Sequence, residues 1–495
     1  MITTQSEPEG TVRVFDPAHP LPFETGVPFP RRQASSSQDY LDAAVAAWRY
    51  IDGFRKEDSE GVYWDDGAQT TKDNQTLYNG QAGIAYFAIE LAQELDDAGI
   101  ESIARRAVHR LALHWRQTLR NDHFPIDGIA YGLHLGVAGV GSVLSIAQRK
   151  YADQIVEQAL RDILAYVIDT SHEDSDGVYW SGNNPLILDG GTILFLLQVY
   201  EAWPSPRLRE LIVKAGRHVL ADGDRSSGGG LILNGTKSFR KYSTPNFELG
   251  TAGAAYILVR LFRLTHDKTL LRAAEDAVRY LDEVSVPQDK GFLIPTRIEP
   301  DGTLFKGNAD LLADDGDANP DHGELRGDYD KPIFYLGACH GPAGTDRLFY
   351  ELARITGRQE YLDRIAANFD GLESLGAPER TSAGLWSVYY CCGHASLLQF
   401  FIGLNRSYPD SRWHDLAVRT ASVLLGVEED AGDDKADWPV SFYRVHPNRV
   451  TRGIGYYDGA AGIAESLLQL YQAEEGTLTV DRLADDPFPT GLGGE

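Results

Sequence analysis

The sequence predicts an all-α protein, an (α/α)7 toroid in which seven inner and seven outer helices alternate around a central cavity. A short signature, two residues followed by Gly-x-x-Gly and an apolar segment, recurs seven times. The segment after each glycine pair is apolar nearly all round, whereas amphipathic segments with charged faces lie between the copies. A helix that is apolar on every side has to be buried. A closed ring of helix pairs buries seven such helices and leaves no exposed end.

The inner helices are expected to follow the seven copies of the signature. The copies begin, in order, at Tyr78, His134, Leu186, Glu248, Cys339, Cys391 and Tyr457. The third copy has Leu188 in place of its first glycine, and the sixth has Ser396 in place of its second. Glycine at the start of a helix permits a tight turn and a close approach between neighbouring helices. Structure alone therefore explains the glycines, and function must come from the residues just before them.

The outer helices are expected in the amphipathic segments between the copies. These segments are 39–54, 102–119, 152–169, 207–222, 269–284, 360–374 and 412–427. Together with the inner helices they define one toroid domain over residues 38–475. An irregular N-terminal tail over 1–37 and a C-terminal tail over 476–495 are expected to flank it.

An insertion interrupts the repeat between the fourth and fifth copies. The second glycines of most copies are 52 to 66 residues apart, but Gly253 and Gly344 are separated by 91. The extra segment, about 285–331, is rich in Asp, Gly and Pro and is predicted to be a partly extended loop. It precedes the first cysteine, so it is either part of a lid or substrate wall, or simple loop padding.

The composition excludes several classes of partner. A net charge of −26 argues against binding to nucleic acid or an anionic membrane, because both require a basic face. No apolar run approaches the roughly 18 residues that a membrane-spanning helix needs. The N-terminal stretch lacks the basic start and apolar run of a secretory signal, so we expect a cytoplasmic protein.

The chain has three cysteines, and all of them fall just before the glycines of two consecutive copies. In a toroid the inner helices run parallel, so the residues that precede them gather at one end of the cavity. Three thiolates that converge at helix N-termini suit a zinc ion. We therefore predict that Cys339, Cys391 and Cys392 bind zinc. The alternatives are a vicinal disulfide and inert buried cysteines.

The motifs YLGACHGPAG, YYCCGHAS, PNFELGTAG and GYYDGAAG resemble those of lanthionine synthetase C-like (LanC-like) proteins. The resemblance extends from about Asp39 to Tyr471. It implies a sevenfold α/α toroid with a catalytic zinc ion, which activates a cysteine thiol for addition to dehydroalanine or dehydrobutyrine. The first zinc cysteine of the family corresponds to Cys339. The family's Cys-His-Gly motif falls on Cys391, Cys392 and Gly393, so Cys392 replaces the usual histidine.

The resemblance implies a stand-alone cyclase that forms lanthionine-type thioethers in a dehydrated precursor peptide. A separate dehydratase or kinase-lyase would prepare that peptide. Two related alternatives are the addition of glutathione to dehydroamino acids and a non-catalytic, zinc-stabilised scaffold that binds the peptide. A carbohydrate enzyme is a further alternative, because such toroids also host sugar hydrolases. It would use Glu248 and Asp458 as its paired carboxylates, but the three cysteines would then have no role.

The sequence departs from the family pattern at two positions. A histidine is expected before the first glycine of the fourth copy, where Leu249 stands, and an aspartate is expected where Asn184 stands. His340, beside Cys339, is the first candidate to replace the lost proton donor, because histidine titrates near neutral pH; packing on the core is its alternative role. His134 is the second candidate, and Glu248 and Asp458 are weaker ones.

Overall fold

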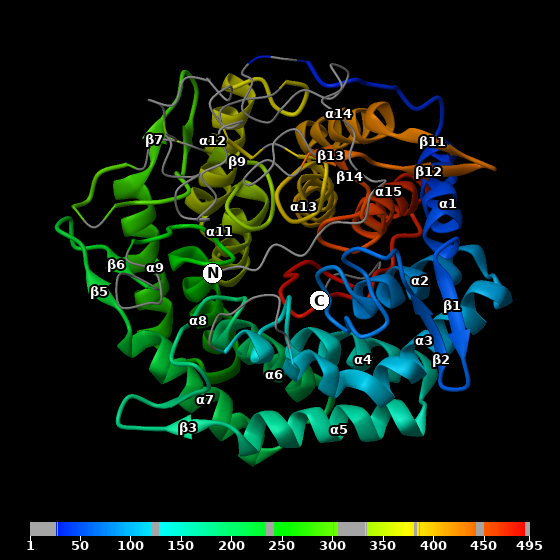
Figure 1. The fold of residues 1–495 in the computed structure, drawn as a ribbon. Helices are drawn as coiled ribbons and strands as arrows, with labels where there is room; N and C mark the ends of the chain where they lie inside the picture. Colours follow the sequence, from blue (N-terminus) through cyan, green and yellow to red (C-terminus); the bar gives the residue numbers. More distant parts are fainter. Residues whose placement is uncertain are drawn as a thin grey trace, which may run out of the picture.

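Among the residues that the computed structural model describes, fourteen α-helices form two concentric rings, which confirms the predicted (α/α)7 toroid (Figure 1). The model describes residues 26, 28–120, 128–233, 242–299, 301–304, 332, 334–380, 384–385, 387–441 and 450–490. Within these residues the inner helices are α2 (Gln81–Leu95), α4 (Val137–Tyr151), α6 (Asp189–Ala202), α8 (Thr251–Thr265), α11 (Pro342–Thr356), α13 (His394–Ser407) and α15 (Ala460–Glu475). The outer helices are α1 (Gln38–Asp52), α3 (Ala98–His114), α5 (Gln154–Asp169), α7 (Pro206–Ala221), α9 (Lys268–Val284), α12 (Gln359–Ser374) and α14 (Ser411–Val427).

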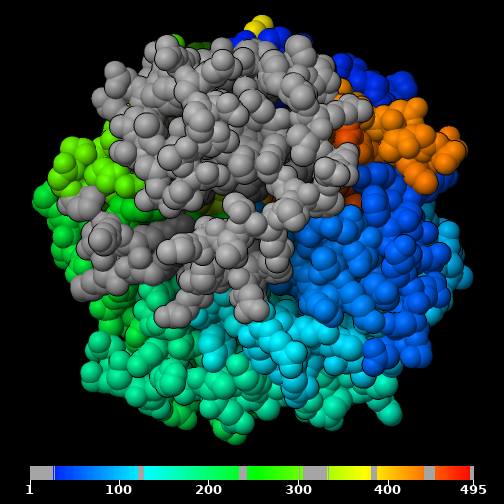
Figure 2. Space-filling model, in the orientation of Figure 1, coloured from blue at the N-terminus to red at the C-terminus, as the bar shows by residue number. Residues whose placement is uncertain are grey.

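The two rings are closed by a contact between the first and last helices. Each inner helix packs against both inner neighbours, and α15 contacts α2 to complete the inner circle. Each inner helix also packs against the outer helix that follows it in sequence, and α1 takes this position beside α15. The space-filling view shows the sequence colours following one another around the rim, from blue through cyan to green (Figure 2).

Burial follows the predicted difference between the two rings. Every residue of α2 from Gln81 to Ala92 is buried. In α9, by contrast, the buried residues recur at helical spacing along one face, and charged residues occupy the other. The apolar inner helices therefore form the core, and the amphipathic outer helices cover it. No helix among the described residues is long and apolar enough to cross a membrane.

Short two-stranded sheets, which the sequence did not predict, lie between the helices. In the described part of the chain five antiparallel hairpins each follow an outer helix. In the first of them, β1–β2 after α1, Arg55 pairs with Trp64 and Asp58 with Gly61. β9 and β10 pair in parallel, whereas β13 and β14 are antiparallel. The strands are β1 (Arg55–Asp58), β2 (Gly61–Trp64), β3 (His172–Glu173), β4 (Val178–Tyr179), β5 (Asp224–Arg225), β6 (Leu231–Ile232), β7 (Val286–Pro287), β8 (Phe292–Leu293), β9 (Phe334–Tyr335), β10 (Gly384–Leu385), β11 (Glu429–Gly432), β12 (Lys435–Asp437), β13 (Val440–Ser441) and β14 (Val450–Thr451).

The predicted tails and insertion are only partly within the described residues. Residues 1–25 and 27 of the N-terminal tail lie outside them, as do residues 300 and 305–331 of the insertion. The described beginning of the insertion contains the β7–β8 hairpin, where Val286 pairs with Leu293. The alternatives of a lid and of loop padding therefore stay predictions.

Residues 477–490, here called the C-terminal segment, contain no helix or strand but lie in the centre of the toroid (Figure 1). The hydroxyl groups of Tyr86 and Tyr256, on opposite inner helices, donate hydrogen bonds to carbonyl groups of the segment at 2.9 and 3.1 Å. Leu478, Val480 and Leu483 are buried. The segment is irregular, yet it forms part of the core.

A buried ion pair holds the C-terminal segment to α11. A guanidinium nitrogen of Arg347 lies 2.8 Å from a carboxylate oxygen of Asp485, and the two side chains are 3% and 5% exposed. Another nitrogen of Arg347 donates a 3.0 Å hydrogen bond to the hydroxyl of Tyr390, which directly precedes Cys391. The pair therefore connects the C-terminal segment to the chain that carries two of the cysteines.

Removing the carboxylate is expected to leave the Arg347 guanidinium buried without its counter-charge. Asp485→Ala should therefore lower the free energy of unfolding by about 3–5 kcal/mol. Glu157→Gln is the control, because Glu157 forms an exposed ion pair with Arg161 (side chains 37% and 56% exposed) and should cost about 1 kcal/mol or less. Urea unfolding curves measure both values, and an equally small effect of the two substitutions contradicts the assigned role.

Candidate metal centre

The first residues of the seven copies are joined by backbone hydrogen bonds into a closed ring, here called the N-terminal ring. In six of the seven links the amide of one first residue donates to the carbonyl of the next. These links are Tyr78 to His134 (3.0 Å), Leu186 to Glu248 (2.9 Å), Glu248 to Cys339 (3.0 Å), Cys339 to Cys391 (3.0 Å), Cys391 to Tyr457 (2.8 Å) and Tyr457 to Tyr78 (2.8 Å). The seventh link uses the residue before His134, since the Leu133 amide donates to Leu186 at 3.4 Å.

Glycine in the first turn of the inner helices makes room for the loops that carry the N-terminal ring. A Cβ atom on Gly344 would lie 1.8 Å from the carbonyl oxygen of Ala338, and one on Gly253 would lie 1.8 Å from that of Phe247. Real Cβ atoms do not approach backbone atoms so closely, so only glycine fits at these positions. The structural role predicted for the glycines is confirmed there.

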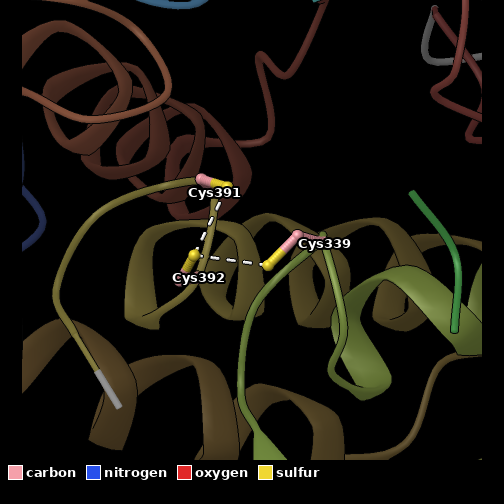
Figure 3. A group of neighbouring side chains, drawn as sticks. All are labelled: Cys339, Cys391 and Cys392. Atoms are coloured by element: carbon pink, nitrogen blue, oxygen red, sulfur yellow. Dashed lines mark hydrogen bonds between the residues drawn. The ribbon is translucent and has the colours of Figure 1, made fainter. Parts of the chain in front are cut away.

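The N-terminal ring brings the three cysteines together, as predicted (Figure 3). The Cys392 sulfur lies 3.3 Å from the Cys339 sulfur and 3.4 Å from the Cys391 sulfur. All three sulfur atoms lie within 4.8 Å of one another. These separations exceed the roughly 2.05 Å of a disulfide, and the cysteines are free. A tetrahedral ion with metal–sulfur bonds of about 2.3 Å holds its sulfurs roughly 3.8 Å apart, so the spacing fits such an ion.

Local contacts fix the turn that carries Cys391 and Cys392. His394, the first residue of α13, has its Nδ1 2.7 Å from the carbonyl oxygen of Ser387 and its Nε2 2.8 Å from that of Pro378. Both ring nitrogens thus contact backbone oxygens of the chain that leads into the turn. Because both of its ring nitrogens have backbone partners, His394 has a structural role and is not a candidate metal ligand.

The electrostatics of the three thiols also fit a bound cation. Burial raises the pKa of the Cys339 thiol well above its usual value. Hydrogen bonds to Cys339 and Cys392, together with burial, raise the pKa of the Cys391 thiol. Three thiolates this close would repel one another unless a cation compensates their charge. A soft ion that prefers sulfur ligands therefore matches the donor set.

A histidine–glutamate pair lies against the cysteines. The Nδ1 atom of His134 is 3.0 Å from a carboxylate oxygen of Glu248. The Cys391 thiol donates to the other Glu248 oxygen at 3.9 Å. The ring of His134 also contacts the ring of Tyr457, with centroids 4.7 Å apart. His134, the second predicted proton donor, is thereby connected to the three cysteines through Glu248.

His340, the first predicted proton donor, lies in a different environment. Its side chain is buried, and its ring contacts that of Tyr335 with centroids 5.1 Å apart. Its carbonyl oxygen accepts a 2.7 Å hydrogen bond from the Asn246 side chain. These contacts fit the alternative of core packing as well as they fit a catalytic role.

The two positions where the resemblance predicts departures are both buried. Leu249 is 9% exposed and belongs to an apolar cluster with Leu135 and Ile187, which also packs against Tyr78. Asn184 is 2% exposed. An apolar wall thus occupies this part of the N-terminal ring.

Asp458, a weaker candidate in the sequence, has an unusual protonation state. Burial raises its pKa to about 8, and the nearby charges of Asp66 and Cys392 act in the same direction. A carboxyl group with this pKa remains largely protonated at neutral pH. The sequence placed Asp458 in the N-terminal ring but contained no sign that it would lie half-buried near a second carboxylate, that of Asp66.

Comparisons with known proteins identify a family and a similar fold. The model of a family described as lanthionine synthetase C-like protein matches residues 71–480. A solved structure of nisin cyclase is similar, with a TM-score of 0.54 and 14% identity over 87% of this chain and 93% of that chain. A GH76 α-mannanase from Bacteroides thetaiotaomicron has a TM-score of 0.44 and 10% identity over 89% of this chain and 96% of that chain. None of the curated proteins matches the sequence.

The geometry predicts that the purified protein contains about one metal ion per chain. Cys339→Ala, Cys391→Ala and Cys392→Ala should each lose most of it, because sites with three protein ligands rarely survive the loss of one. His340→Asn is the matched control, since His340 is adjacent to Cys339 but outside the triad. Elemental analysis after gel filtration measures the metal, and full retention in all three cysteine variants refutes the site.

Proposed function

The chain belongs to the lanthionine synthetase C-like family, and from this premise we propose that it is a zinc-dependent cyclase. It would join a cysteine thiol to a dehydroalanine or dehydrobutyrine in a ribosomally made peptide, forming a lanthionine-type thioether. The single observation that carries the proposal is the convergence of three free cysteine sulfurs within 4.8 Å at one end of the toroid. The substrate would be a precursor peptide dehydrated by a separate dehydratase or kinase-lyase.

Zinc is the metal that best suits the three cysteines. It binds thiolates readily and has no redox chemistry that would oxidise them. Three protein ligands leave one position of a tetrahedral ion for a substrate thiol. When bound, the ion would lower the pKa of that thiol, so that thiolate is available near neutral pH. The roles of Cys339, Cys391 and Cys392 as ligands are part of this proposal.

The proposed reaction requires a proton as well as a thiolate. The thiol sulfur forms a bond to Cβ of the dehydroamino acid, the Cα=Cβ π bond breaks, and Cα takes up one proton. The proton that leaves the thiol balances the one that Cα gains, so the peptide mass does not change. A group that can donate a proton near neutral pH is needed beside the metal centre.

The contacts favour His134 as this donor. Its Nδ1 lies 3.0 Å from a carboxylate oxygen of Glu248, and Nε2 would exchange a proton with the substrate. Glu248 in turn is 3.9 Å from the Cys391 sulfur, so the pair adjoins the metal centre. His340 is the second candidate because it follows Cys339 directly in the sequence.

One observation favours a second function, a zinc-stabilised scaffold that binds a modified peptide without turnover. Leu249 contributes to an apolar wall where the family pattern predicts a histidine. Such a wall could hold an apolar peptide side chain but could not transfer a proton. The paired carboxylates of a sugar hydrolase have less support, because Glu248 contacts His134 and Cys391.

The cyclase proposal predicts that zinc-loaded protein consumes one thiol per ring formed in a dehydrated, cysteine-bearing peptide, at constant peptide mass. Alkylation followed by mass spectrometry counts the remaining thiols, with the uncatalysed reaction subtracted and Cys392→Ala as the inactive control. A mass increase of one glutathione per site, in the presence of glutathione, indicates the glutathione alternative. Binding with neither change rejects the cyclase and supports the scaffold.

The assignment of the proton donor predicts different effects for two histidine variants. His134→Gln should retain metal and folding but slow thioether formation by about 10²-fold, the usual scale for general acid–base catalysis. His340→Asn should change the rate only a few-fold. Single-turnover rates, compared at equal zinc content, measure both. The opposite pattern assigns the role to His340, and two unaffected rates exclude both histidines.

A further inference from the structure

A second cavity lies at the other end of the inner helices, away from the cysteines. It has a volume of about 530 Å³, within the range of pockets that bind small molecules. The last turns of α4, α6, α8 and α11 form its wall together with the C-terminal segment. Five arginines line it: Arg149, Arg260, Arg263, Arg354 and Arg482.

The arginines outnumber the carboxylates that neutralise them. Three of the five have partners of their own, in the pairs Arg149–Asp481 (3.2 Å), Arg260–Glu201 (3.6 Å) and Arg482–Asp486 (3.0 Å). Arg263 and Arg354 both face one buried carboxylate, that of Glu351, at 3.7 and 3.0 Å. Among the described residues these five guanidinium groups therefore form ion pairs with four carboxylates, although the net charge of the chain is −26.

Two of these arginines keep hydrogen-bond donors for a ligand. The Arg263 side chain is 42% exposed, and its ion pair with Glu351 is longer than a hydrogen bond. The Arg354 side chain is 28% exposed, and its buried Nε has no hydrogen-bond partner within the described part of the chain. Burial and the neighbouring guanidinium groups of Arg354 and Arg260 lower the pKa of Arg263. An anion would relieve both the repulsion and the unsatisfied donor.

A purely structural role explains only part of this arrangement. Basic residues stabilise the last turn of a helix by interacting with its dipole, and this accounts for Arg149, Arg263 and Arg354. It does not account for two arginines that share one carboxylate, or for a buried guanidinium nitrogen without a partner. Both features indicate that a group outside the described residues completes the site.

We propose that this cavity binds a small phosphorylated molecule whose phosphate group contacts Arg263 and Arg354. A phosphate is doubly charged and has the oxygen geometry that planar guanidinium groups bind with two parallel hydrogen bonds. The lining carboxylates of Glu201 and Asp486 can accept hydrogen bonds from hydroxyl groups elsewhere in the ligand. Because the C-terminal segment forms one wall, the ligand would also hold that segment in the toroid.

The site is independent of the proposed cyclase activity. Arg263 lies twelve residues after Thr251, the first residue of α8, which is roughly 18 Å along the helix axis. The cysteines lie at the opposite, N-terminal ends of the inner helices. Binding at the arginines can therefore be measured whether or not thioether formation is observed.

Isothermal titration of the metal-loaded full chain with inorganic phosphate, and with succinate as a dicarboxylate, tests the proposal at constant ionic strength. Phosphate should bind saturably at one site and at least about tenfold more tightly than succinate. Arg263→Gln and Arg354→Gln should each weaken phosphate binding about tenfold or more, the effect of losing a charge-assisted hydrogen bond. Arg225→Gln is the control, because Arg225 pairs with Asp276 outside this cavity. This variant should bind phosphate as tightly as the parent protein does.

Three results overturn the proposal: no saturable phosphate binding, equal binding by Arg263→Gln and the parent, and succinate binding as tight as phosphate. Arg354→Gln removes a partner of the buried Glu351, so unfolding curves without ligand accompany both variants. If Arg354→Gln does not fold, Arg263→Gln decides the outcome alone, because its side chain is 42% exposed.

Discussion

The closed ring of backbone hydrogen bonds at the N-terminal ends of the inner helices is the constraint on which the site depends. Six of the seven first residues donate to the next copy and Leu133 supplies the seventh link, so the position of one loop constrains the others. Cys339 donates to Cys391, and Cys391 donates to Tyr457. The cysteine sulfurs therefore converge because the backbone has already converged. A metal ion would complete an arrangement that seven helix pairs hold in place.

The sequence predicts the toroid well because its evidence is local and repeated. Seven glycine signatures and alternating apolar and amphipathic segments specify the helices, and the order of the copies makes Cys339 and Cys391 neighbours. The C-terminal segment has no such pattern. Its burial depends on contacts such as that of Asp485 with Arg347, 138 residues away, which no periodicity encodes. The pairing of α1 with α15 likewise follows from closure of the rings, because the sequence alone places α1 before α2.

The distinction between local, repeated patterns and contacts between distant residues also explains which parts of the site the sequence could predict. Neighbouring copies supply the three cysteines, whereas His134 and Glu248 belong to the second and fourth copies, and Glu248 reaches Cys391 of the sixth. Contacts across the N-terminal ring depend on side-chain length and direction, which copy order does not specify. Its position next to Cys339 in the sequence therefore favours His340 as the proposed proton donor. The contacts instead favour His134, which lies two copies away from its carboxylate partner, Glu248.

The parallel inner helices give the two ends of the toroid opposite electrostatic character. Their N-terminal ends carry partial positive charge, which favours thiolates over thiols and so suits the cysteines. Their C-terminal ends carry partial negative charge, which opposes the binding of an anion. Any anion in the arginine-lined cavity must therefore be held by the guanidinium groups against the helix dipoles. The excess of guanidinium groups over local carboxylates provides the positive charge that anion binding requires. The C-terminal segment lines this cavity and also contacts Arg347, so it is the element that would respond to a bound anion.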